Sequence, residues 1–175
     1  MTLRKRIVIY SYIIILMIIL GLLYPYVFRW ASQKEFEYRN ESLNATALCL
    51  LLYVHDHHGR FPESREQLIK QGYMQLDNGS IKIRVPKGLC LKKSTIKLPE
   101  DLYDNVCYDY IKPVYTIYDV KYGIKCDDLI IIDGKVCDKN EHHPVALIDG
   151  LYYPQEQVDY ISMLIYKQMK AATKT

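Results

Sequence analysis

IVIYSYIIILMIILGLLYPYVF, at residues 7–28, is a run of 22 residues without a charge, and it decides how the rest of the chain is interpreted. At about 1.5 Å per residue, a helix of this length crosses a hydrocarbon core of about 30 Å. A cleavable signal peptide would have an apolar region of only about 7–15 residues, followed by small residues at the cut. This chain instead continues with Phe28, Arg29 and Trp30. We therefore predict that residues 1–30 form an uncleaved, single-pass signal anchor.

The charges beside the apolar run predict its orientation. Arg4, Lys5 and Arg6 directly abut the run, which favours a cytoplasmic N-terminus, although Arg29 and Lys34 follow on the other side. We predict an anchor in the inner (cytoplasmic) membrane with residues 31–175 outside the cytoplasm. The formal charge is only +3 and no basic tract or basic-aromatic motif occurs, which argues against a nucleic-acid partner.

Residues 31–58 have the pattern of an amphipathic helix that continues the anchor. Apolar side chains recur with helical spacing in one stripe, made up of Phe36, Leu43, Ala47, Leu50, Leu51 and Val54. Polar side chains such as Asn40 and Asn44 fall mainly outside the stripe. Because such a stripe needs a partner surface, the spacing predicts one long spine helix with a folded body packed along its second half.

The end of the spine helix is marked by a glycine and a proline. Gly59 favours a helix C-terminus and Pro62 prevents its continuation. Ser64 and Gln67 then have the spacing of a capping box, so we predict a short helix at residues 64–71 that closes on Gly72.

This part of the chain resembles a known family. The segment LYVHDHHGRFPES at residues 52–64, followed by Gln67-Leu68 and by Gly72-Tyr73-Met74, is similar to the end of the long helix in bacterial pilin-like proteins. The closest resemblance is to the major pseudopilin of type II secretion. It implies a pilin-like α+β fold and a structural or adaptor role in a secretion or envelope system.

The resemblance does not extend to the start of the apolar run. Pilin-like proteins carry a glycine-phenylalanine cleavage junction there and a glutamate a few residues further on. In this chain Arg6 meets Ile7, the first glycine is Gly21, and nothing acidic precedes Glu35. The resemblance therefore concerns the fold, and does not cover peptidase processing or polymerisation through that glutamate.

The remainder of the chain predicts an antiparallel sheet at residues 81–153 and a terminal helix at 154–171. Ile81, Ile83 and Val85 alternate with Lys82 and Arg84, which is the period of a half-exposed strand. Asp-Gly pairs at 133–134 and 149–150 follow apolar runs and indicate type I′ hairpin turns. The terminal helix has an apolar stripe of Val158, Ile161, Leu164, Ile165 and Met169, and should pack on the sheet.

Cysteines and histidines provide the alternative to a purely structural role. If the body is exported, Cys90–Cys107 and Cys126–Cys137 are plausible disulfides, whereas Cys49 fits a buried free thiol. If the closing hairpin lay beside the end of the spine helix, the group His55, His57 and His58 could meet His142 and His143 around zinc or copper. That would make the protein a membrane-tethered metal- or ligand-binding module. The simpler interpretation is that His57 and His58 interact with the helix C-terminus and that no metal binds.

No motif of an enzyme is present. The chain has no nucleophile motif, phosphate-binding loop or spaced carboxylate pair, so we expect no catalytic residue and no cofactor. Protein partners are expected to bind through the spine helix or the C-terminal helix.

Overall fold

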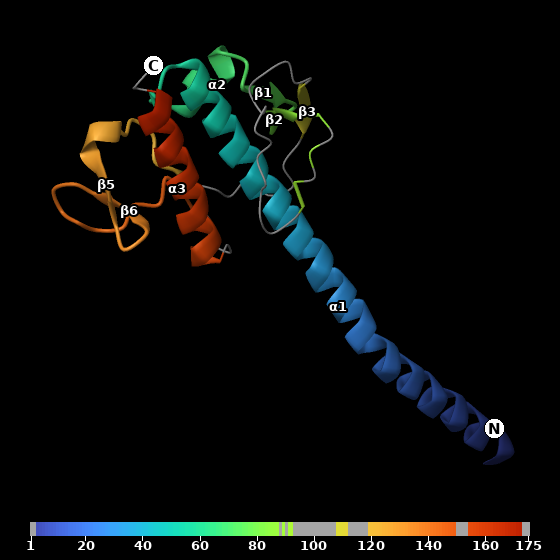
Figure 1. Ribbon diagram of the computed structural model, residues 1–175. Helices are drawn as coiled ribbons and strands as arrows, with labels where there is room; N and C mark the ends of the chain where they lie inside the picture. The colour runs from blue at the N-terminus through green and yellow to red at the C-terminus, as the bar shows by residue number, and fades with distance from the viewer. Residues whose placement is uncertain are drawn as a thin grey trace. The chain divides into compact units, whose positions relative to one another are not determined.

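One helix, α1 (Leu3–Asp56), runs through Pro25 without a break (Figure 1). The computed structural model describes residues 3–87, 89, 91–92, 108–111, 119–149 and 154–172. The chain forms two compact units, an N-terminal unit (Met1–Phe36) and a C-terminal unit (Glu37–Thr175), so the boundary between them falls within α1. The predicted continuity of anchor and spine in one helix is confirmed.

The N-terminal unit exposes its apolar side chains. Between residues 12 and 30 the exposed fraction of the large apolar side chains ranges from 46% at Ile19 to 74% at Tyr26. Soluble monomers rarely expose contiguous apolar patches larger than a few hundred Å², so such a surface is unusual for a protein in water. The helix is long and apolar enough to cross a membrane.

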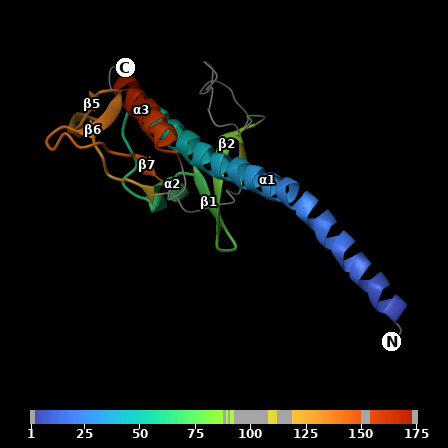
Figure 2. The same ribbon diagram turned by 90° about the horizontal axis from the view of Figure 1, so that it is seen from below.

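Between residues 42 and 54, α1 is buried on all of its faces. The stripe residues in this part are buried as predicted, but the polar residues between them are buried as well. Every residue of 42–54 is buried, including Thr46 and also Asn44, which was predicted to fall outside the stripe. Phe36, placed on the stripe, is instead 46% exposed in the N-terminal unit. The reason is that α3 (Gln155–Ala172) lies along one side of this part of α1 and the sheet of β1–β3 along another (Figures 1 and 2).

Two asparagines, one helical turn apart, hold a distant segment against α1. Asn44 Nδ2 donates a hydrogen bond to the carbonyl oxygen of Leu91 at 2.6 Å, and Asn40 Nδ2 donates to that of Lys92 at 3.5 Å. A buried amide is tolerated where its hydrogen bonds are made within the protein. These contacts explain why Asn40 and Asn44 are buried and are not on a solvent-facing side of the helix.

Helix α1 ends in a Schellman motif that uses a histidine in the position usually taken by glycine. Gly59 N–H donates to Val54 O at 2.8 Å and His58 N–H donates to His55 O at 3.3 Å. His58 has φ 53° and Gly59 has φ 84°. The predicted stop at Gly59 is therefore confirmed, but the left-handed residue that begins it is His58.

Replacing His58 with glycine should stabilise the C-terminal unit. A side chain in the left-handed region is strained by about 1–2 kcal/mol, part of which the greater flexibility of glycine in the unfolded chain offsets. We expect His58→Gly to raise the free energy of unfolding by roughly 0.5–1 kcal/mol, as measured by urea denaturation. Gly59→Ala is the reverse test and should lower it by about 1 kcal/mol. A loss of stability in His58→Gly would contradict this account of the helix end.

The short helix after Pro62 forms as expected, slightly shorter than predicted. Helix α2 (Arg65–Lys70) begins after Ser64, whose hydroxyl accepts from Gln67 N–H at 3.3 Å. Gln67 Oε1 accepts from Glu63 N–H at 2.7 Å. In a capping box it would accept from the N–H of the N-cap residue itself, Ser64. Gly72, with φ 81°, closes the helix.

The described strands are antiparallel, as predicted, but they form three small sheets. The prediction of a single sheet at 81–153 is therefore wrong. The first has the order β1 (Met74–Asp77), β2 (Ser80–Pro86), β3 (Tyr108–Ile111). The second pairs β5 (Leu129–Ile132) with β6 (Lys135–Asp138). The third pairs β4 (Asp119–Val120) with β7 (Ile148–Asp149). Each sheet covers its own part of one shared core, to which Ile83, Val136 and Ile148 all belong.

Two of the predicted features of these strands are confirmed. Asp133 and Gly134 connect β5 and β6 with φ 48° and 76°, as a type I′ turn requires. Strand β2 has the alternating burial predicted for it. The second predicted turn, at 149–150, cannot be compared in full because residues 150–153 lie outside the described residues, but Asp149 itself pairs with Asp119.

The C-terminal helix is confirmed. Helix α3 buries Val158, Ile161, Ile165 and Met169 in the core, whereas Leu164 of the predicted stripe is only half-buried. Tyr166 and Ser162 are buried in addition, and Ser162 Oγ accepts from Leu147 N–H at 3.0 Å.

Candidate functional site

A cleft of about 640 Å³ lies where α1 ends. Its walls come from the last turn of α1 with the loop after it, from α2, and from the segment that includes Gly123 and Cys126. Gly123 N–H donates to Pro62 O at 2.9 Å and so joins two of these walls. The helix stop thus positions the cleft, because Gly59 and Pro62 turn the chain back over the end of α1.

Aromatic rings form one wall of the cleft. Tyr53 and His57 are four residues apart and therefore share a helix face, with ring centroids 4.2 Å apart. Tyr73 packs edge-on against Tyr53 at 5.4 Å, and its hydroxyl donates a hydrogen bond to Asp56 Oδ2. The guanidinium of Arg84 lies 5.9 Å from the Tyr73 ring centroid. The ring cluster thus links α1 to the chain segment that leads into β1.

Burial keeps the hydroxyls and the thiol of this region protonated. Burial, and then the hydrogen bond to Asp56, raise the pKa of Tyr73 well above its usual range. Burial also raises the pKa of Tyr53. Cys49 is a fully buried free thiol, as predicted, and burial raises its pKa strongly. A thiol that stays protonated is a poor nucleophile, so these groups are suited to packing and hydrogen bonding.

The raised pKa of Tyr73 predicts a loss of stability in alkali. Below its unfolded pKa of about 10, Tyr73 is protonated in both states and contributes no pH dependence. Above about pH 10 the unfolded chain loses this proton first, so stability should fall with rising pH, by at most about 1.4 kcal/mol per pH unit for this one group. We expect Tyr73→Phe to remove that part of the slope in urea denaturation between pH 9 and 11.5. An unchanged slope in Tyr73→Phe would contradict the assignment.

The histidines do not converge. His55 and His58 are exposed at the end of α1, His57 is half-buried against Tyr53, and His142 and His143 are exposed in the loop after β6. Among the residues that the structure describes, no three His, Cys, Asp or Glu side chains are grouped so that they could hold a metal ion. The described residues therefore give no support to the alternative in which the two histidine groups meet around zinc or copper. Nearness in sequence within each group did not bring the two groups together in space.

The disulfide between Cys126 and Cys137 that was plausible for an exported body is not formed in the structure. Both are free thiols. Cys137 lies opposite Ile130 in the β5–β6 ladder, whereas Cys126 lies in the 3-10 helix η1 (Cys126–Asp128), before that ladder begins. Cys90 and Cys107 lie outside the described residues.

The hydrogen bond between Tyr73 and Asp56 was not predicted from the sequence, although both residues lie in the segment that resembles the pilin-like family. No protein-family model, curated protein or solved structure matches the chain.

The charges of the cleft are mixed. Arg60 and Lys125 contribute cations, and Glu63 and Asp127 contribute carboxylates, beside the rings of Tyr53 and His57. Aromatic side chains and arginine are enriched at the surfaces by which proteins bind their partners, and polar groups surround them. The cleft is accordingly the candidate binding site of the C-terminal unit.

Proposed function

We propose that the protein is a single-pass, signal-anchored protein of the inner membrane, with its N-terminus in the cytoplasm and its C-terminal unit outside the cytoplasm. In this proposal the C-terminal unit is a pilin-like, pseudopilin-type structural or adaptor component of a secretion or envelope system, and it is not an enzyme. The observation that carries the proposal is the continuity of α1, one helix that is exposed and apolar at 12–30 and buried at 42–54.

The burial pattern along α1 supports an anchored body. The exposed segment provides the apolar side chains that a bilayer would cover, at about 25 cal/mol for each Å² removed from water. The buried segment is the centre of the core of the C-terminal unit. Because the two segments belong to one helix, a membrane that held the first segment would also tether the folded unit.

The charges support the proposed orientation. Arg4, Lys5 and Arg6 directly precede the apolar run, and a cluster of cations at that position favours the cytoplasmic side. Tyr24, Tyr26 and Trp30 are exposed at the other end, where aromatic side chains favour the membrane–water interface. Partner binding through α1 would have to use its exposed residues, because 42–54 are buried.

Protease protection tests the topology. With epitope tags at both ends and a permeabilised outer membrane, added protease should remove the C-terminal tag while the N-terminal tag stays protected until the inner membrane is lysed. A C-terminal tag that resists protease until lysis, or a product released from the membrane, would overturn the proposed location.

Crosslinking and imaging test the structural role. Chemical crosslinking in intact cells should give discrete species that contain this chain and other envelope proteins, and electron microscopy would show whether filaments form. Loss of these species in a variant with an unfolded C-terminal unit would show that they depend on its fold. A chain that forms no crosslinked species at several reagent lengths, and no filament, would contradict a structural or adaptor role.

A further inference from the structure

Three depressions on the C-terminal unit share lining residues in series, and together we call them the basic groove. The cleft at the end of α1 shares Cys126 and Asp127 with a second depression of about 550 Å³ beside β5. The second shares Ile131, Tyr166 and Lys170 with a third of about 450 Å³ on α3. Because the depressions adjoin in series and do not merge into one deep cavity, the groove suits an extended chain better than a compact small molecule.

Cations outnumber carboxylates along this groove. Its lining includes two carboxylates, Glu63 and Asp127, and five permanent cations, Arg60, Lys125, Lys139, Lys167 and Lys170. All five cationic residues are exposed. Within the described part of the chain, Lys125, Lys139 and Lys167 have no salt-bridge partner. An excess of unneutralised positive charge attracts acidic groups and speeds their encounter with the surface.

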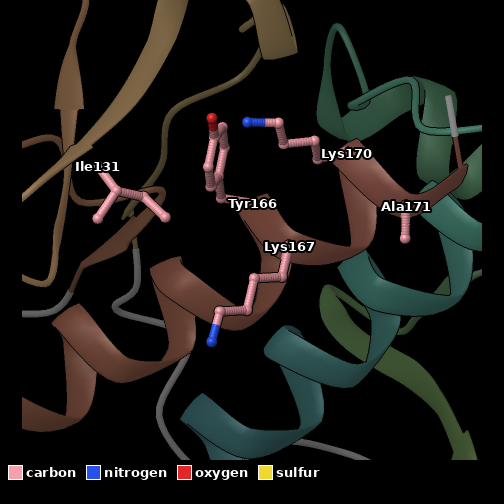
Figure 3. Close-up of a pocket in the computed structure, with 5 residues that line it drawn as sticks. All are labelled: Ile131, Tyr166, Lys167, Lys170 and Ala171. Atoms are coloured by element: carbon pink, nitrogen blue, oxygen red, sulfur yellow. The ribbon is translucent and has the colours of Figure 1, made fainter. Parts of the chain in front are cut away.

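An apolar contact surface lies among these cations. Ile131 on β5 is 47% exposed and faces the groove, although the residues beside it in the strand are less exposed. Tyr166 lies across from it on α3, anchored by a hydrogen bond from its hydroxyl to Leu129 O at 3.3 Å. Figure 3 shows the Lys170 side chain reaching towards the Tyr166 hydroxyl, and Lys170 Nζ lies 5.7 Å from the ring centroid. Lys167 extends from α3 in another direction and lines the same depression (Figure 3).

We propose that this basic groove binds an acidic, extended segment of a partner protein, with an apolar side chain of that segment seated on the exposed Ile131. The positive charge of the groove favours acidic residues in the bound segment, and the row of three depressions favours an extended conformation. The exposed isoleucine favours an apolar side chain between the acidic residues. Such a segment would belong to the partner of the proposed adaptor, so this proposal rests on the proposed function for the partner's setting in the envelope. Binding by the purified chain is independent of membrane topology, so the two can fail separately.

Fluorescence anisotropy with synthetic peptides tests the groove. The full chain in detergent is titrated into a fluorescein-labelled ten-residue peptide of glutamates with two central leucines. We expect saturable binding that weakens steeply with added salt, and at least tenfold weaker binding when the glutamates are replaced by lysines or the leucines by serines. Lys167→Glu combined with Lys170→Glu should also weaken binding at least tenfold. The matched control, Lys87→Glu with Lys121→Glu, changes the net charge equally outside the groove and should alter binding less than twofold.

Protection of Cys126 gives a local measurement in the same samples. Cys126 lines two of the three depressions and is half-buried, so a bound peptide should slow its alkylation by iodoacetamide, as followed by peptide mass spectrometry. Three results would each overturn the proposal. The acidic and basic peptides could bind equally well, the two double variants could have equal effects, or bound peptide could leave the alkylation of Cys126 unchanged. Two other results would also overturn the proposal. In these the peptide stays unbound while the chain self-associates or binds phosphatidylglycerol nanodiscs, and that activity is lost in Lys167→Glu combined with Lys170→Glu.

Discussion

Leu48→Ala is expected to lower the free energy of unfolding of the C-terminal unit by about 2–5 kcal/mol. Leu48 has no exposed surface and belongs to the shared core, although it lies outside the predicted apolar stripe. The substitution removes apolar contacts and leaves a cavity that a helix enclosed on all sides cannot easily fill. Urea denaturation of the full chain in detergent, followed by the near-ultraviolet circular dichroism of its tyrosines, measures the loss.

The same substitution elsewhere in the same helix is the control. Leu16 is 56% exposed in the N-terminal unit, so Leu16→Ala should change the unfolding of the C-terminal unit by less than about 0.5 kcal/mol. A loss below about 1 kcal/mol in Leu48→Ala would mean that α1 is not the centre of the core. Equal effects at the two positions would contradict the division of α1 into an exposed and a buried part.

The existence of α1 could be predicted from the sequence, but its burial could not. Helical spacing and the absence of a strong breaker before Gly59 are local signals. Asn40 and Asn44 were predicted to fall outside the buried stripe, because nothing local shows which groups satisfy their hydrogen bonds. In the structure Asn44 donates to Leu91 O, and Thr46 Oγ1 donates to Ser42 O at 3.0 Å. The Asn44 contact joins positions 47 residues apart, which a single sequence does not reveal.

Hairpin turns were predictable where an Asp-Gly pair follows an apolar run. The Asp133-Gly134 hairpin follows from the need for positive φ at both positions. Asn78-Gly79 connects β1 and β2 with φ 48° and 79°, and was overlooked although it carries the same signal. The partition of the strands into three sheets was not predictable, since pairs such as Asp119 with Asp149 depend on the whole fold.

The candidate sites show the same limit. The stop that positions the cleft, Gly59 and Pro62, was predicted because it is local. The basic groove was not predicted, because Lys125, Lys139 and Lys170 come from separate segments and no basic tract connects them. The alternative in which the histidines meet around a metal could not be decided from the sequence, because a cluster in sequence says nothing about the distance to another cluster.

Ile15→Arg combined with Ile18→Arg is expected to remove the protein from membranes. The two positions lie one turn apart near the middle of the apolar run, and both side chains are at least half exposed. An arginine at the centre of a membrane span is unfavourable by about 2.5–3.5 kcal/mol, so two should oppose insertion by about 5–7 kcal/mol. Flotation of membranes after carbonate extraction measures the fraction that remains inserted. We expect most of the wild-type chain, and little of the double variant, in the floating fraction.

The matched control places two arginines at the same spacing beyond the apolar run. Ser32 and Glu35 are exposed residues of α1, so Ser32→Arg with Glu35→Arg should leave flotation unchanged. Because Leu48→Ala disturbs only the core, that variant should also stay in the floating fraction, which separates anchoring from folding. If the Ile15 and Ile18 double variant floats like the wild type, the exposed part of α1 is not a membrane span. Its apolar side chains would then have to be covered by protein, and α1 would serve as a docking helix and not as an anchor.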